Sequence, residues 1–178
     1  MKSSKSILFN LILILIIASS YWWVSVWKSS SHYQLAPPFE LPLITEETRS
    51  PKTVELSQLK GKPTLINFWA SWCSSCELEK DSLMHLWKTY GKNKLQILSI
   101  ASMDTINDII KSGKLKQRQY QVALDENGSV AQAYGVYVLP YSFLLNSQGK
   151  VVDSYKGILD KQKLQSLEGQ LKKLSQEK

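Results

Sequence analysis

The alternation of apolar and polar positions predicts a succession of strands and helices after an apolar amino-terminal stretch. Continuous apolar runs bounded by turn residues, at 64–69 and 95–100, predict strands that are buried on both faces. Shorter strands are predicted at 39–43, at the start of 54–63, at 121–124 and in a hairpin with arms at 142–146 and 150–157. Pro42 restricts the first of these to a sheet edge, because proline has no N–H for the strand ladder.

Helical periodicity occupies the segments between these strands and the end of the chain. The predicted helices run from Cys73 to Tyr90, from 103 to 113, from 129 to 135 and from 160 to 174. Their apolar stripes are Leu78, Leu83, Leu86, Trp87 and Tyr90 in the first helix, and Leu164, Leu167, Leu171 and Leu174 in the last. Gly113 and Gly135 end two of the helices, and Asp160 caps the last one. Strands that alternate with helices and close with a hairpin predict an α/β fold with a mixed sheet.

The apolar amino-terminal stretch, residues 7–27, predicts a single transmembrane helix. It contains no charge, and its 21 residues make a helix of about 31 Å, which matches a hydrocarbon core of about 30 Å. Lys2 and Lys5 precede the stretch and only Lys28 follows it closely, which favours a cytoplasmic amino terminus and an external domain. Its far end is rich in aromatic residues that prefer the membrane interface: Tyr21, Trp22, Trp23 and Trp27.

A cleaved signal peptide is the alternative interpretation of the same stretch. Ala18, Ser19 and Ser20 have the small side chains of a cleavage site, but the apolar stretch continues for seven residues past Ser20. Both interpretations export the globular part. We therefore expect a cytoplasmic terminus (1–6), a transmembrane signal anchor (7–27), a linker (28–38) and a globular domain (39–178).

Composition and charge restrict the class of partner. The hydrophobic fraction of 43% is enough for a core that does not need disulfides. The net charge is +7, but Lys2, Lys5 and Lys28 beside the apolar stretch carry three of those charges. The other basic residues are scattered, without the aromatic interleaving of a nucleic-acid surface, so no nucleic-acid partner is expected.

The only two cysteines of the chain, Cys73 and Cys76, lie in the segment NFWASWCSSCELEK. A metal site would need about four ligands. Only His32 and His85 could join the cysteines, so we expect no metal and no other cofactor. A structural disulfide is a second alternative, although closing so short a loop gains little chain entropy.

A reactive pair is the third alternative and the one that the position in the chain favours. Cys73 follows a buried strand and begins a helix, where backbone N–H groups and the helix dipole stabilise a thiolate. Cys76 lies one turn further on and can attack a mixed disulfide formed on Cys73. Two cysteines at this spacing between a strand and a helix are typical of redox motifs.

Two longer segments, LKGKPTLINFWASWC and YGVYVLPYSFLLNSQGKVVDSYKG, carry a family resemblance. Over about residues 37–174, the chain resembles the thioredoxin superfamily, specifically its membrane-anchored TlpA-like branch of ResA and CcmG/DsbE types. The resemblance implies a thioredoxin-like fold, a mixed central sheet flanked by helices, with residues 103–124 as an extra strand–helix insertion. It also implies a single-pass protein of the bacterial inner membrane whose domain faces the periplasm.

The resemblance also implies roles for individual residues. Cys73 would be the attacking thiol and Cys76 the resolving thiol, and together they would form the redox-active disulfide Cys73–Cys76. Glu79 matches the buried acid that carries protons to the resolving thiol. Pro140 matches the cis-proline that lies against the cysteine pair. Asn67 stands where ordinary thioredoxins have a buried aspartate, which makes Glu79 the expected proton carrier.

The substrate groove of this family lies beside the cis-proline. Here it would be formed by Trp72, which shields one side of the pair, by the Leu139 backbone and by Tyr141. The chain also departs from its relatives, because Asp81 replaces a helix-kinking proline and predicts a straighter helix. Residues 74–75, a pair of serines between the cysteines, are unusual and help to set the redox potential.

The expected activity is that of an extracytoplasmic thiol-disulfide oxidoreductase that reduces disulfides in exported proteins. The implied partners are protein substrates such as apocytochrome c, as in cytochrome c maturation, and a thiol protein of the membrane that supplies electrons. A disulfide-forming oxidant of the same fold is the first alternative. An anchored binding or chaperone module is the second, and the reactivity of Cys73 distinguishes it from an enzyme.

Overall fold

A mixed β-sheet forms the centre of the computed structural model, which describes residues 34–45, 49–91, 93–116 and 118–176. The strands are β1 (Glu40–Ile44), β2 (Arg49–Glu55), β3 (Thr64–Trp69), β4 (Gln96–Ser102), β5 (Gln121–Asp125), β6 (Tyr141–Leu145) and β7 (Val151–Lys156). Their order across the sheet is β2-β1-β5-β4-β3-β6-β7. The central strands β5, β4 and β3 are parallel, and the outer pairings are antiparallel. The sheet confirms the predicted α/β class.

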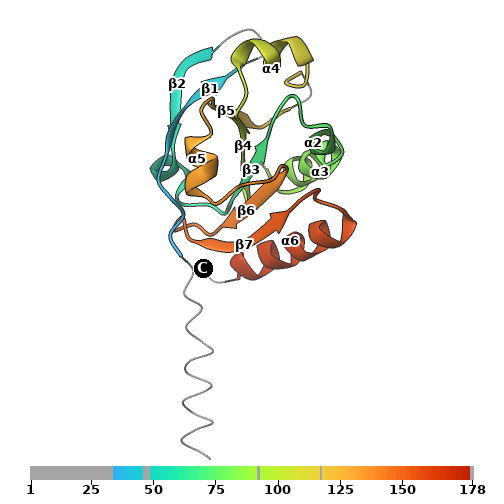
Figure 1. Ribbon diagram of the computed structural model, residues 1–178. Helices are drawn as coiled ribbons and strands as arrows, with labels where there is room; N and C mark the ends of the chain where they lie inside the picture. Colours follow the sequence, from blue (N-terminus) through green and yellow to red (C-terminus); the bar gives the residue numbers. More distant parts are fainter. Residues whose placement is uncertain (1–33, 46–48, 92, 117, 177–178) are drawn as a thin grey trace, which may run out of the picture. The chain divides into compact units, whose positions relative to one another are not determined.

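Helices cover both faces of this sheet. They are α2 (Ser74–Glu77), α3 (Lys80–Tyr90), α4 (Ile106–Ser112), α5 (Ser129–Ala133) and α6 (Lys161–Leu174), with a 3₁₀ turn, η1, at Leu56–Leu59. Figure 1 shows α5 against one face and α3 with α6 against the other. The core clusters agree with this arrangement, since Val130 of α5 packs with Phe68, whereas Leu83 and Leu167 pack with Leu65.

Strand β3 is the most deeply buried element of the sheet. All six of its residues are buried, because β4 and β6 pair with its two edges and helices cover its two faces. Phe68 points toward α5, where its ring centroid lies 5.3 Å from that of Tyr134 and 6.0 Å from that of Phe143. The segment that follows β3 therefore starts from a fixed position at the end of the sheet.

Two local signals in the sequence are confirmed by the backbone. Gly113 ends α4 in the left-handed region with φ of 67°, where a residue without Cβ is not strained. Asp160 caps α6, and its side chain accepts a hydrogen bond from the Lys163 N–H at 3.0 Å. Gly113 ends a helix and Asp160 accepts a backbone N–H at the start of one, and both effects involve residues within a few positions. The sequence alone can therefore predict them.

The expected edge position of β1 is wrong. β1 lies between β2 and β5, and it pairs antiparallel with both strands. The sheet tolerates Pro42 here because the ladder is irregular, with a register shift between Pro42 and Ile44 on the β2 side. On the β5 side the pairing consists of Leu43 opposite Ala123. A proline can therefore occupy an inner strand where the ladder is short and interrupted.

The single helix predicted from Cys73 to Tyr90 is also wrong, because Leu78 and Glu79 interrupt it between α2 and α3. No proline is needed for this break, since the Glu79 side chain turns inward and bonds to other elements. Leu78 is 71% exposed and does not belong to the apolar stripe, whereas Leu83 and Leu86 are fully buried. The straighter helix expected from Asp81 is not formed.

The first described residues are attached to the β6–β7 turn. The Gln34 carbonyl accepts a hydrogen bond from the Val151 N–H at 2.9 Å, and the Ala36 N–H donates to the Gly149 carbonyl at 3.1 Å. Among the residues that the structure describes, no helix has the length and apolar character needed to cross a membrane. The predicted span, residues 7–27, lies outside the described residues.

We predict that Leu83→Ala lowers the free energy of unfolding by about 2–5 kcal/mol, because it leaves a cavity in a fully packed core. Leu78→Ala is the matched control in the same segment and should change stability by less than about 0.5 kcal/mol, since Leu78 is exposed. Urea unfolding followed by tryptophan fluorescence measures both changes. Equal losses in the two variants would contradict the assignment of these leucines to core and surface.

Candidate active site

The two cysteines lie directly after β3, at the start of α2. Their Sγ atoms form a disulfide, and their Cα atoms are 5.4 Å apart. Cys73 is the N-cap of α2, and its Sγ accepts a hydrogen bond from the Cys76 N–H at 3.2 Å. The same donor would stabilise a thiolate on Cys73 in the reduced protein. The expected disulfide is thus present, at the predicted strand-to-helix boundary.

A groove gives access to Cys73 but not to Cys76. It has a volume of about 400 Å³, and Cys73 is part of its lining whereas Cys76 is not. Both residues are largely buried, with 6% of the Cys73 surface and 2% of the Cys76 surface exposed, so the difference between them is the contact of Cys73 with the groove. The other lining residues are Trp72, Ser74, Ser75, Met103, Val136, Tyr137, Val138 and Leu139. This asymmetry suits a first thiol that meets the substrate and a second thiol that acts from inside.

The groove walls expose large apolar side chains. Trp72 is 62% exposed and Tyr137 is 86% exposed. The indole of Trp72 is held in place by a hydrogen bond from its Nε1 to the Met103 carbonyl at 3.0 Å. Such side chains suit contacts with an unfolded or extended protein segment, because aromatic rings bury much surface with few rotatable bonds.

The Leu139–Pro140 peptide bond is cis. Leu139 lines the groove and packs against the cluster that contains the cysteines, so the structure places Pro140 next to a residue of the site. Tyr141 is not part of the groove lining, because its ring stacks on Phe143 with centroids 4.7 Å apart. Of the expected groove residues, Trp72 and Leu139 thus line the groove together with Cys73, whereas the Tyr141 ring packs on Phe143.

Glu79 is buried at the break between α2 and α3, with 1% of its surface exposed. Its Oε1 accepts a hydrogen bond from the Asn67 Nδ2 at 2.7 Å, and its Oε2 accepts one from the Leu159 N–H at 3.0 Å. Asn67 also donates to the Ser142 Oγ and accepts from the Ser99 Oγ, both at 3.1 Å. The carboxyl group therefore ends a polar network that is surrounded by core residues.

Burial raises the pKa of Glu79 from its ordinary range to about 7. The hydrogen bonds from Asn67 and Leu159 and the charge of Arg118 act in the opposite direction, but desolvation of the carboxylate outweighs them. At neutral pH this group exchanges a proton readily, as an acid–base catalyst must. The acid lies three residues after Cys76 in the chain.

Glu77, the neighbouring acid, behaves differently. Partial burial acts to raise its pKa, but a hydrogen bond from Lys80 at 2.7 Å and the charges of Lys80, Arg118 and Lys114 lower it overall. Glu77 therefore stays ionised when Glu79 takes up a proton. The two acids of the segment CELEK have separate roles, which supports Glu79 as the proton carrier.

Several residues of the site were not anticipated from the sequence. Met103, Tyr137 and Val138 line the groove although they come from two loops outside the cysteine segment. Arg118 places its guanidinium 3.9 Å from the ring centroid of Trp69 and donates to the Tyr120 hydroxyl at 2.9 Å. The one available signal was the apolar run before Pro140, which is unusual for an exposed loop.

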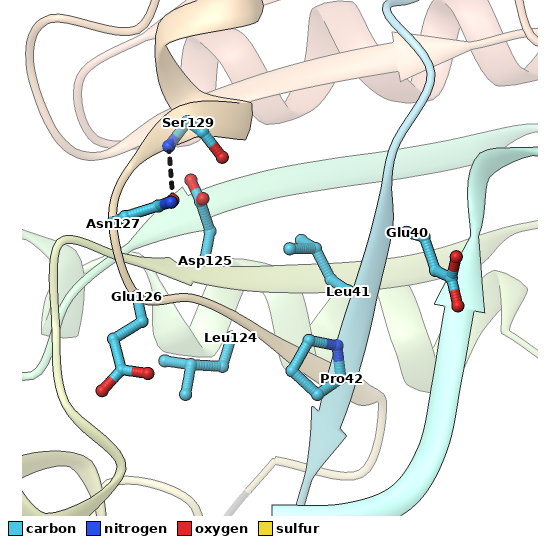
Figure 2. Close-up of a pocket in the computed structure, with 8 residues that line it drawn as sticks. All are labelled: Glu40, Leu41, Pro42, Leu124, Asp125, Glu126, Asn127 and Ser129. Carbon is cyan, nitrogen blue, oxygen red and sulfur yellow. Dashed lines mark hydrogen bonds between the residues drawn. The ribbon is translucent and has the colours of Figure 1, made fainter.

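A second hollow, at the carboxyl end of β5, is not a candidate site (Figure 2). The Asp125 carboxylate there accepts hydrogen bonds from the Val130 N–H at 3.2 Å and the Ala131 N–H at 2.9 Å, and from the Ser102 hydroxyl. Figure 2 shows the Asn127 side chain accepting from the Ser129 N–H in the same turn. These groups hold the first turn of α5, so their role is structural.

Residues 33–154 match the AhpC/TSA family. The chain belongs to this family. It is 35% identical over 127 residues to the thiol-disulfide oxidoreductase ResA of Bacillus thuringiensis subsp. konkukian, covering 70% of each protein. It is 32% identical over 125 residues to the thiol:disulfide interchange protein DsbE of Pseudomonas fluorescens biotype C, covering 70% of this chain and 66% of the relative.

Solved structures that resemble this chain share its thioredoxin-like fold. A thiol-disulfide oxidoreductase from Bacteroides fragilis superposes with a TM-score of 0.62 at 28% identity, covering 79% of this chain and 99% of that one. The resemblance inferred from the sequence is therefore confirmed. With a cysteine disulfide at the family's motif, the protein is a thiol-disulfide oxidoreductase.

We predict that the raised pKa of Glu79 makes the oxidised protein less stable as the pH rises. The folded protein retains a proton on Glu79 up to about pH 7, whereas the unfolded chain releases it near the ordinary pKa of 4.5. Stability from this group is complete below pH 4.5 and is lost as the pH rises through 7, by about 3 kcal/mol. Urea unfolding at a series of pH values should show a decline in the wild type that Glu79→Gln removes. Parallel profiles for the two proteins would contradict it.

Proposed function

We propose that this protein is a membrane-anchored, extracytoplasmic reductase of disulfides in exported proteins. The observation that supports it is the asymmetric pair, in which Cys73 lines an open groove and Cys76 does not, together with a buried acid, three residues after Cys76 in the chain, whose pKa is about 7. One thiol can meet a bulky protein disulfide, and the other needs an internal proton acceptor before it can react. A structural bridge needs neither feature.

The reaction begins from the reduced protein. The Cys73 thiolate, stabilised by the Cys76 N–H, attacks one sulfur of the substrate disulfide and expels the other as a thiolate, which then takes up a proton. The Cys76 thiol next loses its proton to the Glu79 carboxylate and attacks the Cys73 sulfur of the mixed disulfide. The second substrate sulfur leaves as a thiolate and takes up a proton, and the protein retains the Cys73–Cys76 disulfide that the structure contains.

Substrate binding is assigned to the groove beside the cis-proline. An extended segment would lie along the Leu139 backbone, with Trp72 and Tyr137 covering apolar side chains near its disulfide. Pro140 keeps this backbone in place, because its own carbonyl accepts a hydrogen bond from the Gly157 N–H at 2.8 Å. Recognition through backbone and apolar surface suits many clients of unrelated sequence.

The location follows from the sequence of residues 7–27 and the charges around it. An uncharged stretch of this length would hold the domain at the outer face of the bacterial inner membrane, where a membrane thiol protein would return the disulfide to the dithiol state. The client that we propose is apocytochrome c, whose thiols must be reduced before haem attachment. The relatives named ResA and DsbE support the reaction class.

We predict opposite outcomes for serine substitutions in the pair. Cys76→Ser should accumulate a mixed disulfide with substrate, because the attacking thiol remains while the resolving thiol is lost. Cys73→Ser should form none. Non-reducing gels of each variant mixed with a disulfide-bonded protein distinguish them, and adducts on Cys76 in the Cys73→Ser variant would reverse the assignment.

We predict that Glu79→Gln slows release of the reduced substrate by about a hundredfold near pH 7, because an amide cannot accept a proton from Cys76. Stopped-flow measurement of the second step at several pH values tests this. Glu77→Gln is the matched control, two residues away, and should leave that step within about threefold of the wild type. Similar slowing in both variants would indicate a general charge effect instead.

The reduction potential decides the direction of electron flow. We expect a value near or below the thioredoxin value of about −270 mV, measured in dithiothreitol buffers by thiol alkylation. The reduced protein should then reduce an oxidised CxxCH peptide from apocytochrome c. A value near the strongly oxidising figure of about −120 mV would make the protein a disulfide donor. A pair that does not exchange at all would leave only an anchored binding module.

A further inference from the structure

A basic pocket lies at the end of the sheet that is remote from the cysteines. It has a volume of about 400 Å³, and the lysines Lys62, Lys94 and Lys172 line it. None of its described lining residues is an aspartate or a glutamate. Leu171 and Leu174 add apolar surface to the same pocket. We call this feature the basic pocket.

The chain topology sets the basic pocket and the redox pair at opposite ends of the strands. Lys62 and Pro63 immediately precede β3, and Lys94 lies two residues before β4. Cys73 follows the other end of β3. α3 and α6 also end at the pocket, since its lining includes Tyr90 and, from the end of α6, Leu171, Lys172, Leu174 and Ser175.

The chain enters the described fold at this same end. Gln34 and Ala36 are hydrogen-bonded to the β6–β7 turn, and residues 146–148 of that turn line the basic pocket. The Gly61 N–H donates to the Ser147 carbonyl at 2.8 Å, which joins the loop that carries Lys62 to the turn. The β6–β7 turn therefore joins the first described residues to the lining of the basic pocket.

Only six residues, 28–33, separate this point from the apolar stretch that ends at Trp27. Fully extended, six residues span about 20 Å. With residues 7–27 in a membrane, this length of chain would limit the separation of Gln34 from the lipid surface to about 20 Å, and the basic pocket lies at the same end of the described domain as Gln34. This step rests on the membrane anchor of the proposed function. Lipid headgroups would thus be an anionic surface that is always close to these lysines.

We propose that the basic pocket binds headgroups of anionic phospholipids in the membrane that holds residues 7–27. Ammonium groups bind phosphate through charge-assisted hydrogen bonds, and the two leucines would contact the glycerol carbons. Among the described residues, none forms an ion pair with Lys62, Lys94 or Lys172, so their charges are free for a ligand. Bound in this way, the domain turns its cysteine groove away from its own membrane.

The test uses the full chain carrying Cys73→Ser and Cys76→Ser, reconstituted in vesicles. One fluorophore is attached at Thr89→Cys, near the pocket but outside its lining, and in a second protein at Tyr137→Cys in the groove. The acceptor is a labelled lipid. In phosphatidylcholine vesicles with phosphatidylglycerol, energy transfer should be stronger from position 89 than from 137. The difference should fall in pure phosphatidylcholine and at 1 M salt, where the Debye length is about 3 Å.

Neutral substitutions test the lysines themselves. A triple variant should abolish the difference in energy transfer between positions 89 and 137, since each lysine contributes about fivefold to binding an anionic surface. It carries Lys62→Gln, Lys94→Gln and Lys172→Gln. The matched control, Lys111→Gln, Lys116→Gln and Lys161→Gln, removes the same charge from exposed sites outside the pocket and should retain the difference. Equal transfer from both positions in anionic vesicles, or equal effects of the two triple variants, would overturn the proposal.

Failure of this proposal can be separated from failure of the proposed function. With the native cysteines restored, both triple variants should reduce a soluble disulfide substrate at the wild-type rate, because none of the six lysines lines the groove. Unchanged activity without lipid orientation would reject the basic pocket and leave the reductase intact. A chain that high-pH carbonate removes from the vesicles would refute the anchor and this proposal together.

Discussion

The buried carboxyl group of Glu79 and its two hydrogen bonds join the elements around the proposed active site. One bond comes from Asn67 on the central strand, and the other comes from the Leu159 N–H in the loop before α6. The same loop begins with Gly157, which donates to the carbonyl of the cis-proline Pro140. A single side chain therefore links the start of the α3 helix, the central strand and the loop that supports the groove.

Burial of Glu79 determines both its hydrogen-bond partners and its raised pKa. Among the described residues, Glu79 accepts hydrogen bonds from an amide and a backbone N–H but from no ammonium or guanidinium group. Desolvation is therefore not offset by a contacting cation, and the pKa of Glu79 rises to about 7. The interaction that shapes the site also tunes it for proton exchange, so packing and chemistry cannot be changed independently there.

Most of the fold could be predicted from the sequence, because its signals are local. The six-residue apolar run of β3, the left-handed glycine after α4 and the aspartate that caps α6 act over a few residues each. The break before α3 and the inner position of β1 could not be predicted in this way. The first depends on a bond from Glu79 to Leu159, eighty positions away, and the second on pairing with β5.

The same distinction separates the parts of the candidate site. Cys73 and Cys76 lie only three positions apart in the chain, and the family resemblance added Glu79 and Pro140. The surroundings of these last two residues are known only from the structure. The walls of the groove include Met103, which the sequence placed at the start of a predicted helix although α4 begins at Ile106, and Tyr137, which follows the helix predicted to end at Gly135. Tyr141 was expected there from its position after Pro140, but the alternation of β6 places its ring on Phe143.

The hydrogen bond from Trp72 to the Met103 carbonyl has a consequence for how clients bind. A wide, exposed indole would otherwise lose rotational freedom each time a substrate docked, and that loss would weaken the complex. Because the ring is already oriented in the free protein, this entropic cost is met during folding and does not recur in each catalytic cycle. A partner that exchanges disulfides with Cys73 can then contact the apolar ring at a lower entropic cost.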